Sequence, residues 1–183
     1  MQQENIVPSP FTVRRLGAAD VDSYRQLRLQ ALRGSSTAFG SSWEEESARP
    51  LASFTRRLES MLMLGGWRGD QLCGTAGCFV HEGLKTQHKG SIVGVYVHPD
   101  ARGSGMGQAL IRELIAQATG RLDTLLLTVT ASNTAAQALY RKLGFEAYGR
   151  EPRSLKIDGQ FYDEILMALQ LPAATPTAGL APR

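Results

Sequence analysis

The sequence predicts a single α/β (α+β) domain built on a mixed central sheet of about seven strands flanked by about four helices. Two observations predict this class. A strand, an amphipathic helix and a second strand follow one another over residues 91–130, which is the order of a crossover with parallel pairing. Three apolar segments, at residues 61–67, 72–80 and 91–98, are joined by polar turns, which indicates antiparallel pairing among them. The third of these segments is also the first strand of the crossover. At 183 residues, with 43% hydrophobic and 20% charged residues, the chain is long enough to bury one such core.

Hydrophobic periodicity predicts each element along the chain. Strand segments alternate or run apolar, whereas helical segments place apolar residues at positions i, i+3, i+4 and i+7. Residues 34–42 form a turn-rich loop before the second helix, and long connections often carry function. The predicted order is β-α-α-β-β-β-α-β-α-β-β, with strands at residues 11–16, 61–67, 72–80, 91–98, 124–130, 145–151 and 160–169, and helices at 20–33, 51–60, 103–119 and between 133 and 144.

Local signals support several of these boundaries. Asn133 is placed to cap the amino end of the fourth helix, and Gly144 stands where a left-handed residue ends it. Asp158 and Gly159 predict a tight turn between the last two strands. The final two strands are therefore expected to form a hairpin.

Both ends of the chain differ from the middle in composition. Residues 1–10 are polar with two prolines, and residues 172–183 are rich in Ala and Thr with three prolines, so we expect a disordered leader, a domain over residues 11–171 and a disordered tail. Residues 1–10 lack the regions of a signal peptide, and no apolar stretch has membrane-spanning length. We expect a cytoplasmic protein without a membrane partner.

Charge and cysteine content exclude other classes. The formal net charge of +3 is small and scattered, so no nucleic-acid partner is expected. Cys73 and Cys78 lie in one predicted strand at an odd separation, which points them to opposite faces and indicates reduced thiols. His98 and the other two histidines form no metal-ligand motif, so no metal is expected, and His98 is better explained as a packing or turn residue. The oligomeric state stays open, with a homodimer as one alternative.

The most informative segment is the loop before the helix at residues 103–119. Gly103, Gly105 and Gly107 alternate there. Glycines let backbone N–H groups approach an anion, and a helix amino end adds unpaired donors, so a phosphate or pyrophosphate fits this loop. The segment lacks the Lys-Ser or Lys-Thr of a P-loop and the GxGxxG spacing of a dinucleotide site. A purely structural turn is the alternative.

Two motifs together carry a family resemblance. Arg102-x-x-Gly105-x-Gly107 is followed by Asn133 and by Ala-x-x-Leu-Tyr-x-x-Leu-Gly-Phe at residues 136–145. This pattern resembles the GNAT superfamily of acyl-CoA-dependent N-acetyltransferases over residues 11–170. The resemblance implies an acyltransferase with acetyl-CoA as co-substrate and no metal. It also implies direct attack on the thioester by a primary amine of a small molecule or peptide.

The same resemblance implies where acetyl-CoA binds. The strands at residues 91–98 and 124–130 are expected to separate, leaving backbone groups for the pantetheine arm. Val97 would stabilise the oxyanion through its N–H, and Tyr140 would give a proton to the departing thiolate, although its apolar helix face is equally typical of a core tyrosine. The implied cofactor-binding residues are Val95, Tyr96, Val97, Arg102, Gly103, Ser104, Gly105, Met106, Gly107, Gln108, Asn133 and Tyr140.

The resemblance identifies the general base and the acceptor site less directly than the cofactor site. Some protein-N-terminus acetyltransferases of the superfamily carry a Glu where this chain has Thr128. The base candidates are the carboxylates of the early loop, among which we choose Glu45, and Asp163 or Glu164 of the last strand. A solvated acidic loop explains the Glu run equally well. The predicted acceptor-binding residues, which combine charge with an apolar wall, are Phe39, Trp43, Glu44, Glu45, Glu46 and Tyr162.

Other functions compete with acetylation of a small amine. One alternative is a non-catalytic acyl-CoA-binding sensor, which the presence of Tyr140 disfavours. A second is a protein N-terminal or lysine acetyltransferase, of which the N-terminal variant is weakened by Thr128. A nucleic-acid-binding module is a third, disfavoured by the scattered charge.

Overall fold

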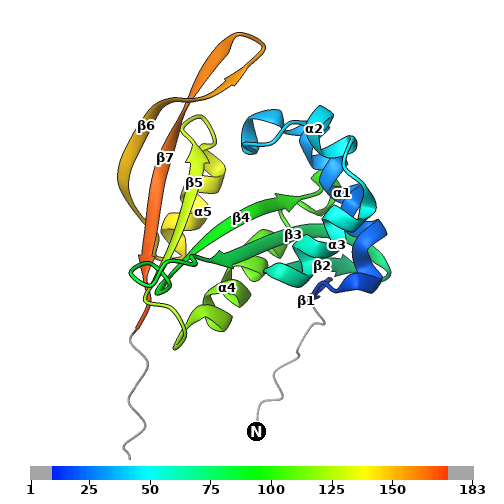
Figure 1. Ribbon diagram of the computed structural model, residues 1–183, viewed down its shortest axis with the longest axis horizontal. Helices are drawn as coiled ribbons and strands as arrows, with labels where there is room; N and C mark the ends of the chain where they lie inside the picture. The colour runs from blue at the N-terminus through cyan, green and yellow to red at the C-terminus, as the bar shows by residue number, and fades with distance from the viewer. Residues whose placement is uncertain (1–9, 173–183) are drawn as a thin grey trace, which may run out of the picture.

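The computed structural model describes residues 10–172, so the predicted leader and tail lie outside the described residues except for their inner ends. The chain forms a seven-stranded sheet in the order β1-β2-β3-β4-β5-β7-β6, in which only β4 and β5 pair in parallel (Figure 1). The elements are β1 (Thr12–Arg15), α1 (Val21–Gly34), α2 (Trp43–Ser47), α3 (Leu51–Ser60), β2 (Leu62–Arg68), β3 (Gln71–Val80), β4 (Lys89–Val97), α4 (Met106–Ala118), β5 (Thr124–Thr130), α5 (Thr134–Lys142), β6 (Glu146–Ile157) and β7 (Gln160–Gln170).

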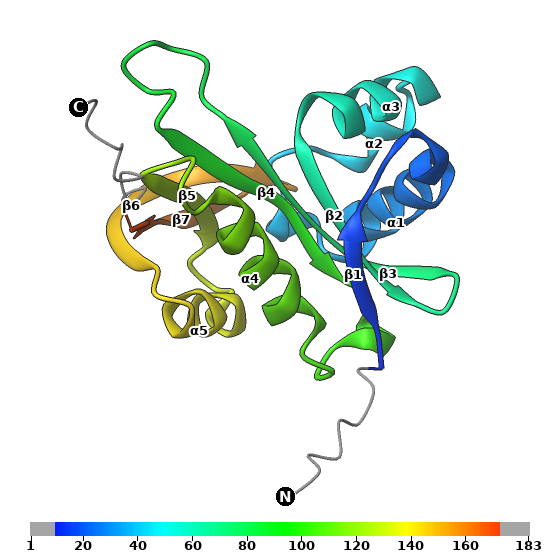
Figure 2. The same cartoon turned by 90° about the horizontal axis from the view of Figure 1, so that it is seen from below.

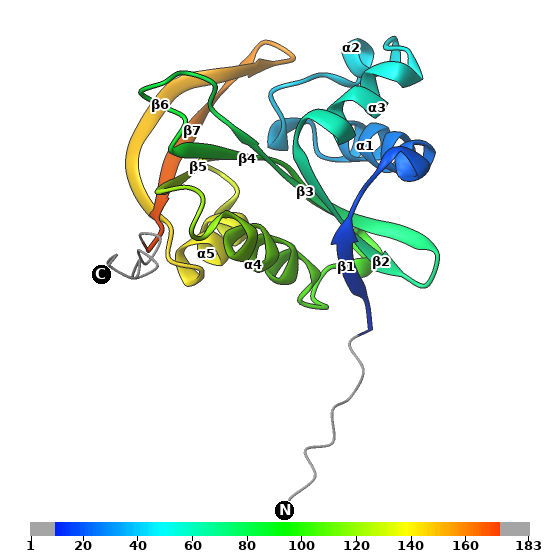
Figure 3. The ribbon, with the colours of Figure 1, turned by 60° about the horizontal axis from the view of Figure 1, so that its bottom comes forward.

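Two layers of helices enclose the sheet. Figures 2 and 3 show α4 and α5 on one face and α1, α2 and α3 on the other. Each layer buries its own core. On the α4 face, Met106, Leu110 and Leu114 pack among strand residues. On the α1 face, the rings of Tyr24 and Phe54 pack edge to face, with 6.2 Å between their centres. The apolar helix faces predicted from periodicity are those that are buried.

The predicted fold class is confirmed, with three local corrections. A short helix, α2, occupies residues predicted as loop, because Ser42 and Glu45 exchange the two hydrogen bonds of a capping box at 3.2 and 3.1 Å. The third long helix begins at Met106 and not at residue 103. Strand β6 continues to Ile157, because a register irregularity between Glu151 and Leu155 accommodates Pro152 without ending the strand.

The two cysteines correct a prediction about strand geometry. Cys73 and Cys78 are free and buried, and both belong to the core cluster on the α4 face. The register of β2 and β3 shifts between Gly66 and Trp67, which leaves Cys73 without a paired residue and breaks strict alternation. Among residues 10–172, no helix has the length and apolar character needed to cross a membrane.

A buried ion cluster joins the three helices of the α1 face. The Glu46 side chain is fully buried and accepts hydrogen bonds from Arg28 Nη2 at 2.8 Å and from Arg57 Nη1 at 3.2 Å. Burial alone would raise the pKa of Glu46, but the hydrogen bonds and charges of Arg28 and Arg57 outweigh it and lower this pKa to about 2. The cluster fixes α2 against α1 and α3.

This cluster predicts an acid-sensitive stability. Glu46→Gln removes the buried counter-charge of Arg28 and Arg57, whose side chains are 10% and 24% exposed, and is expected to lower the free energy of unfolding by about 3 kcal/mol. The folded pKa of Glu46 is lower than its ordinary value of 4.5, so its stabilisation is complete above pH 4.5 and is lost as pH falls toward 2. That loss amounts to about 3 kcal/mol. Urea unfolding of the unmodified protein and of Glu46→Gln between pH 2 and 7 measures this loss of stability.

Glu44→Gln is the matched control, because Glu44 is an exposed residue of the same helix. It is expected to change the free energy of unfolding by less than about 0.5 kcal/mol. Equal stabilities of the Glu44→Gln and Glu46→Gln proteins would contradict the structural role of the cluster.

Candidate active-site groove

The groove arises where β4 and β5 stop pairing. Their parallel ladder covers only Lys89, Gly90 and Ser91 of β4, and from Leu127 onward β5 pairs with β7 alone. A bulge bends β4 at this point. Gly94 adopts a φ of +62°, a conformation that glycine takes without strain, and its carbonyl accepts a hydrogen bond from Thr75 Oγ1 of β3 at 3.0 Å. Figure 1 shows the two strands diverging beyond their shared segment.

A cavity of about 960 Å³ lies in this opening. Its walls are β4, β5, the loop before α4, the first turns of α5 and the connection between α1 and α2, with one residue from β7. All the predicted cofactor-binding residues line it except Ser104, whose hydroxyl turns back to donate to Ala101 O at 2.6 Å. The structure therefore brings together, in one groove, motifs that lie about 30 residues apart in sequence.

The loop before α4 ends in a helix terminus without a side-chain cap. Gly103 and Gly105 have φ values of +74° and +86°, and Gly105 is the N-cap residue. The first helical hydrogen bond joins Ala109 N to Gly105 O. The N–H groups of Met106, Gly107 and Gln108 consequently need another acceptor, and they sit at the positive end of the helix dipole. This end of the groove is suited to an anion.

Tyr140 lines the other end of the groove from α5. Its side chain is 6% exposed and meets the edge of the Phe145 ring at 5.9 Å. Within the described part of the chain, its hydroxyl has no hydrogen-bond partner, and the oxygen is not one of the buried unpartnered atoms, so it is open to the groove. Burial raises the pKa of Tyr140 to about 12, so the hydroxyl keeps its proton at neutral pH. The group can therefore donate a hydrogen bond into the groove.

Asn133 and Arg102 contribute at the rim. The Asn133 side-chain oxygen accepts the Ala136 N–H at 3.1 Å, as the predicted helix cap requires, and leaves its amide nitrogen available. Arg102 Nε donates to Val97 O at 3.2 Å, which holds a positive charge beside the loop. No group of His, Cys, Asp and Glu among residues 10–172 is arranged to hold a metal.

The structure places most of the predicted acceptor residues elsewhere. Phe39 lines the groove, with the Arg28 guanidinium 4.5 Å from its ring centre and the Tyr96 ring 6.4 Å away. The other five residues do not line it. Their positions have separate structural causes: Trp43 lies under the Arg33 guanidinium, Glu44 is exposed, Glu45 caps α2, Glu46 belongs to the ion cluster, and Tyr162 lies in β7 outside the cavity lining.

Comparison with known proteins assigns the family. Residues 28–145 match the acetyltransferase (GNAT) family, which covers more than half of the chain. The chain belongs to the acetyltransferase (GNAT) family. An N-alpha-acetyltransferase RimI of Mycobacterium tuberculosis is 31% identical over 152 residues, which are 82% of this chain and 87% of that protein. This GNAT membership confirms the predicted family and the acyltransferase class.

Two further GNAT comparisons show the limits of the match. An uncharacterized protein of Mycobacterium leprae is 32% identical over 82% of this chain, but the matched part is only 38% of that longer protein. The structure of a GNAT phosphinothricin acetyltransferase from Sinorhizobium meliloti, in complex with AcCoA, has a TM-score of 0.78. It is 22% identical and covers 94% of this chain and 96% of its own. At that identity the likeness shows the fold.

The sequence prediction missed part of this GNAT groove. Thr37, Ser41 and Thr130 also line it, and Thr130 Oγ1 donates to Thr37 O, which ties the α1–α2 connection to β5. Glu164 of β7, named above only as an alternative base, is the one carboxylate lining the groove among the described residues. Glu164 is brought to the groove by its pairing with Thr130 of β5. The sequence alone does not give the register of β7 against β5, so it could not single out Glu164.

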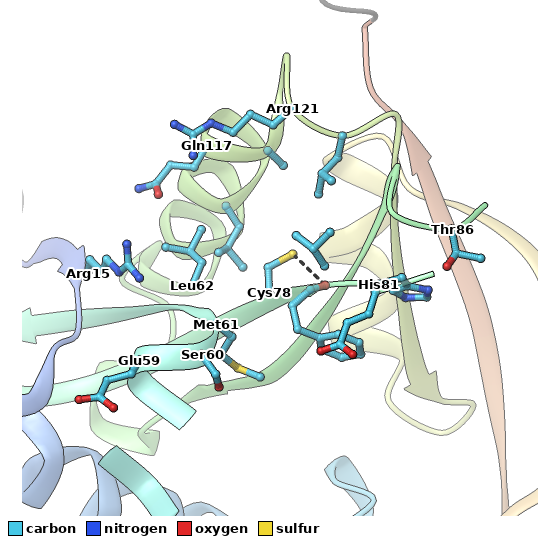
Figure 4. A pocket seen from close by; sticks show the side chains of 16 residues that line it. Arg15, Glu59, Ser60, Met61, Leu62, Cys78, His81, Thr86, Gln117 and Arg121 are labelled. Atoms are coloured by element: carbon cyan, nitrogen blue, oxygen red, sulfur yellow. Dashed lines mark hydrogen bonds between the residues drawn. The ribbon is translucent and has the colours of Figure 1, made fainter. Parts of the chain in front are cut away.

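A second cavity of about 810 Å³ lies apart from the groove, between the end of β3 and the carboxyl end of α4 (Figure 4). Cys78 lines its floor, and Arg15 and Arg121 lie at its sides. Burial raises the pKa of the Cys78 thiol to about 11, so the thiol stays protonated at neutral pH and is a poor nucleophile. None of its lining residues is shared with the groove.

The loop geometry predicts a selective loss of cofactor affinity. In Gly105→Ala, a Cβ at positive φ shifts the backbone and obstructs an approaching anion, so we expect acetyl-CoA binding to weaken at least about ten-fold. Gly120→Ala is the matched control. Gly120 has a φ of +78°, equally open surroundings and a position at the opposite end of α4.

Both substitutions are expected to lower the free energy of unfolding by a similar 1–2 kcal/mol or so, because both strain the backbone by about that amount. Only Gly105→Ala is expected to reduce affinity in calorimetric titration with acetyl-CoA. An equal loss of affinity in both variants would show that general destabilisation, and not the anion site, is responsible.

Proposed function

We propose that the chain is an N-acetyltransferase that moves the acetyl group of acetyl-CoA to a primary amine of a small molecule or peptide, by direct attack within a ternary complex. The observation that carries this proposal is the groove between β4 and β5, which joins an uncapped helix terminus to the hydroxyl of Tyr140. An anion-binding end and a proton-donating end are what a phosphate-bearing thioester requires.

The residues present fit acetyl-CoA. The N–H groups at the start of α4, with Arg102 beside them, would hold the pyrophosphate. The free edge of β4 and the amide of Asn133 would bind the amide groups of the pantetheine arm, much as a strand edge binds an extended peptide. When bound, acetyl-CoA supplies an acetyl group already activated as a thioester.

The direction of the Val97 N–H supports its proposed role. His98 N donates to Cys73 O at 2.7 Å, so the backbone groups of His98 face β3. Successive residues of a strand direct their backbone groups to opposite edges, and the Val97 N–H therefore faces the groove. The contact between Arg102 Nε and Val97 O agrees with this direction. The Val97 N–H would stabilise negative charge on the acyl oxygen during attack.

Tyr140 would act as the proton donor to the leaving thiolate. Its raised pKa keeps the proton on the hydroxyl at neutral pH, and the unpartnered Oη faces the groove. The leaving group is a thiolate whose conjugate acid has a pKa of about 8.5, so it accepts a hydrogen bond from the neutral hydroxyl. The hydroxyl would stabilise the thiolate as the carbon–sulfur bond breaks.

A peptide or protein N-terminus is a second acceptor that one observation favours. The similarity to the N-alpha-acetyltransferase RimI of Mycobacterium tuberculosis extends over most of both chains. Thr128, at the position where the sequence comparison expected a carboxylate in such enzymes, is exposed on β5. A protein acceptor would therefore need its carboxylate from another strand.

Two measurements test the proposal together. Calorimetry follows acetyl-CoA binding, and a thiol assay follows CoA release with amino acids, polyamines, aminoglycosides and short peptides as acceptors. Binding with amine-dependent thiol release is the expected result. Binding without release by any amine would identify the acyl-CoA sensor, and absence of binding would contradict both functions.

Tyr140→Phe predicts a loss of turnover without loss of fold. The substitution removes one hydroxyl that has no hydrogen-bond partner in the described chain, so the thermal midpoint should change little. Loss of proton donation is expected to lower kcat about 100-fold to 10,000-fold while leaving the Kd of acetyl-CoA within about three-fold.

Tyr148→Phe is the control for this measurement, because Tyr148 is 59% exposed on β6 and does not line the groove. Its kcat should match that of the unmodified protein. Full activity of Tyr140→Phe would assign Tyr140 to core packing alone.

A further inference from the structure

Glu164 is singled out by its place in the sheet. It pairs with Thr130 in the β5–β7 ladder, so the two side chains project from the same face. Thr128 lies two residues along β5 on that face, and both threonines line the groove. Among residues 10–172, no other Asp or Glu lines this cavity.

Two other carboxylates, Asp163 and Glu46, are already paired. Asp163, the neighbouring residue, binds Arg150 Nη2 at 2.6 Å and the Arg153 N–H at 2.8 Å. Glu46 binds the Arg28 guanidinium, which lines the same groove, so that cation is neutralised. Within the described chain, Glu164 has no cationic partner and accepts a single side-chain hydrogen bond, from Ser154 Oγ to its Oε2 at 2.7 Å.

The charge arrangement around Glu164 favours the binding of a cation. Glu151 of β6 stands directly opposite Glu164 in the β6–β7 ladder. Like charges at paired positions destabilise a sheet, and a bound cation would offset this repulsion. The Ser154 hydroxyl fixes one carboxylate oxygen and leaves the other for a ligand.

We propose that Glu164 binds the acceptor of the acetyl group as a cationic primary amine, with Phe39 forming an apolar wall of the same groove. This inference rests on the proposed function and adds the substrate class to it. The ammonium group would donate a hydrogen bond to the free Glu164 oxygen, and uncharged isosteres of the amine would lose this interaction. The bound ammonium would then give one proton to solvent, because only the neutral nitrogen has the lone pair that attacks the thioester. Glu164 is thus the residue that selects a charged amine.

The test compares two probes that differ only in this charge, 2-phenylethylamine and 2-phenylethanol. Binding is measured by calorimetric competition and by protein-observed NMR titration at pH 7, with CoA-saturated and with free protein. The unmodified protein is expected to bind the amine at least about ten-fold more tightly than the alcohol, as a hydrogen bond to a charged group predicts. In Glu164→Gln the ratio of the two affinities should fall to near one.

Glu151→Gln is the matched control, because Glu151 carries the same charge at the paired position but does not line the groove. It should keep the preference for the amine. Glu164→Gln relieves the repulsion between the two carboxylates, so its thermal midpoint should be unchanged or raised. A lowered midpoint together with lost binding of both probes would indicate a structural role and would overturn the proposal.

The outcomes separate this proposal from the proposed function. No preference for the amine in the unmodified protein, or a preference that survives in Glu164→Gln, overturns the role of Glu164 whether or not acetyl-CoA binds. A different result would overturn acetyl transfer alone. In that case the protein does not bind acetyl-CoA, but it still prefers the amine over the alcohol and loses this preference in Glu164→Gln. With a turned-over amine, the KM of the amine should rise more than kcat falls in Glu164→Gln.

Discussion

The hydrogen-bond ladder between β4 and β5 ends after three residue pairs, and the remaining structure of the site depends on that ending. A parallel pair that continued would bury the inner edges of both strands and leave no groove. The bulge at Gly94, held by Thr75, turns β4 away. Free strand edges need other partners for their N–H and C=O groups, so the opening is suited to a ligand that carries amides. In the proposed mechanism, the glycine loop supplies the groove with an anion-binding end and α5 supplies a proton donor.

The ion cluster of Glu46 determines the shape of the opposite wall. It joins α1, α2 and α3, and the Arg28 guanidinium that it fixes lies against the Phe39 ring. The hydrogen bond from Thr130 to Thr37 attaches the same connection to β5. Replacing a whole buried cluster of this kind by apolar residues often costs little stability, whereas removing one member costs much, so we attribute to the cluster a role in specifying one arrangement of the helices. Its function here is positional, because its carboxylate is fully used by two arginines.

Features that depend on neighbouring residues were predictable from the sequence. The Asn133 cap, the left-handed Gly144 and the Asp158-Gly159 turn are present as predicted, with φ values of +93° at Gly144 and +80° at Gly159. The surroundings of the acidic run were only partly predictable, because the contacts of Glu45 are local and those of Glu46 are distant in sequence. The Ser42 and Glu45 capping box is a local signal, whereas Arg28 and Arg57 reach Glu46 from residues 18 and 11 positions away. Carboxylates next to an aromatic residue predict charge, but only the packed helices show that this charge is neutralised.

The two halves of the groove are specified by different physical means. The proposed cofactor half depends on a short motif whose glycines and helix terminus act through the backbone. This motif can therefore be recognised in one continuous stretch of sequence. The proposed acceptor half depends on the register of β7 against β5, which brings Glu164 opposite Thr130. A shift of one residue in that register would turn Glu164 to the α5 face and Ile165 into the groove. If Glu164 binds the acceptor as proposed, acceptor selectivity can therefore change through strand pairing and single substitutions on β7 while the cofactor motif stays the same.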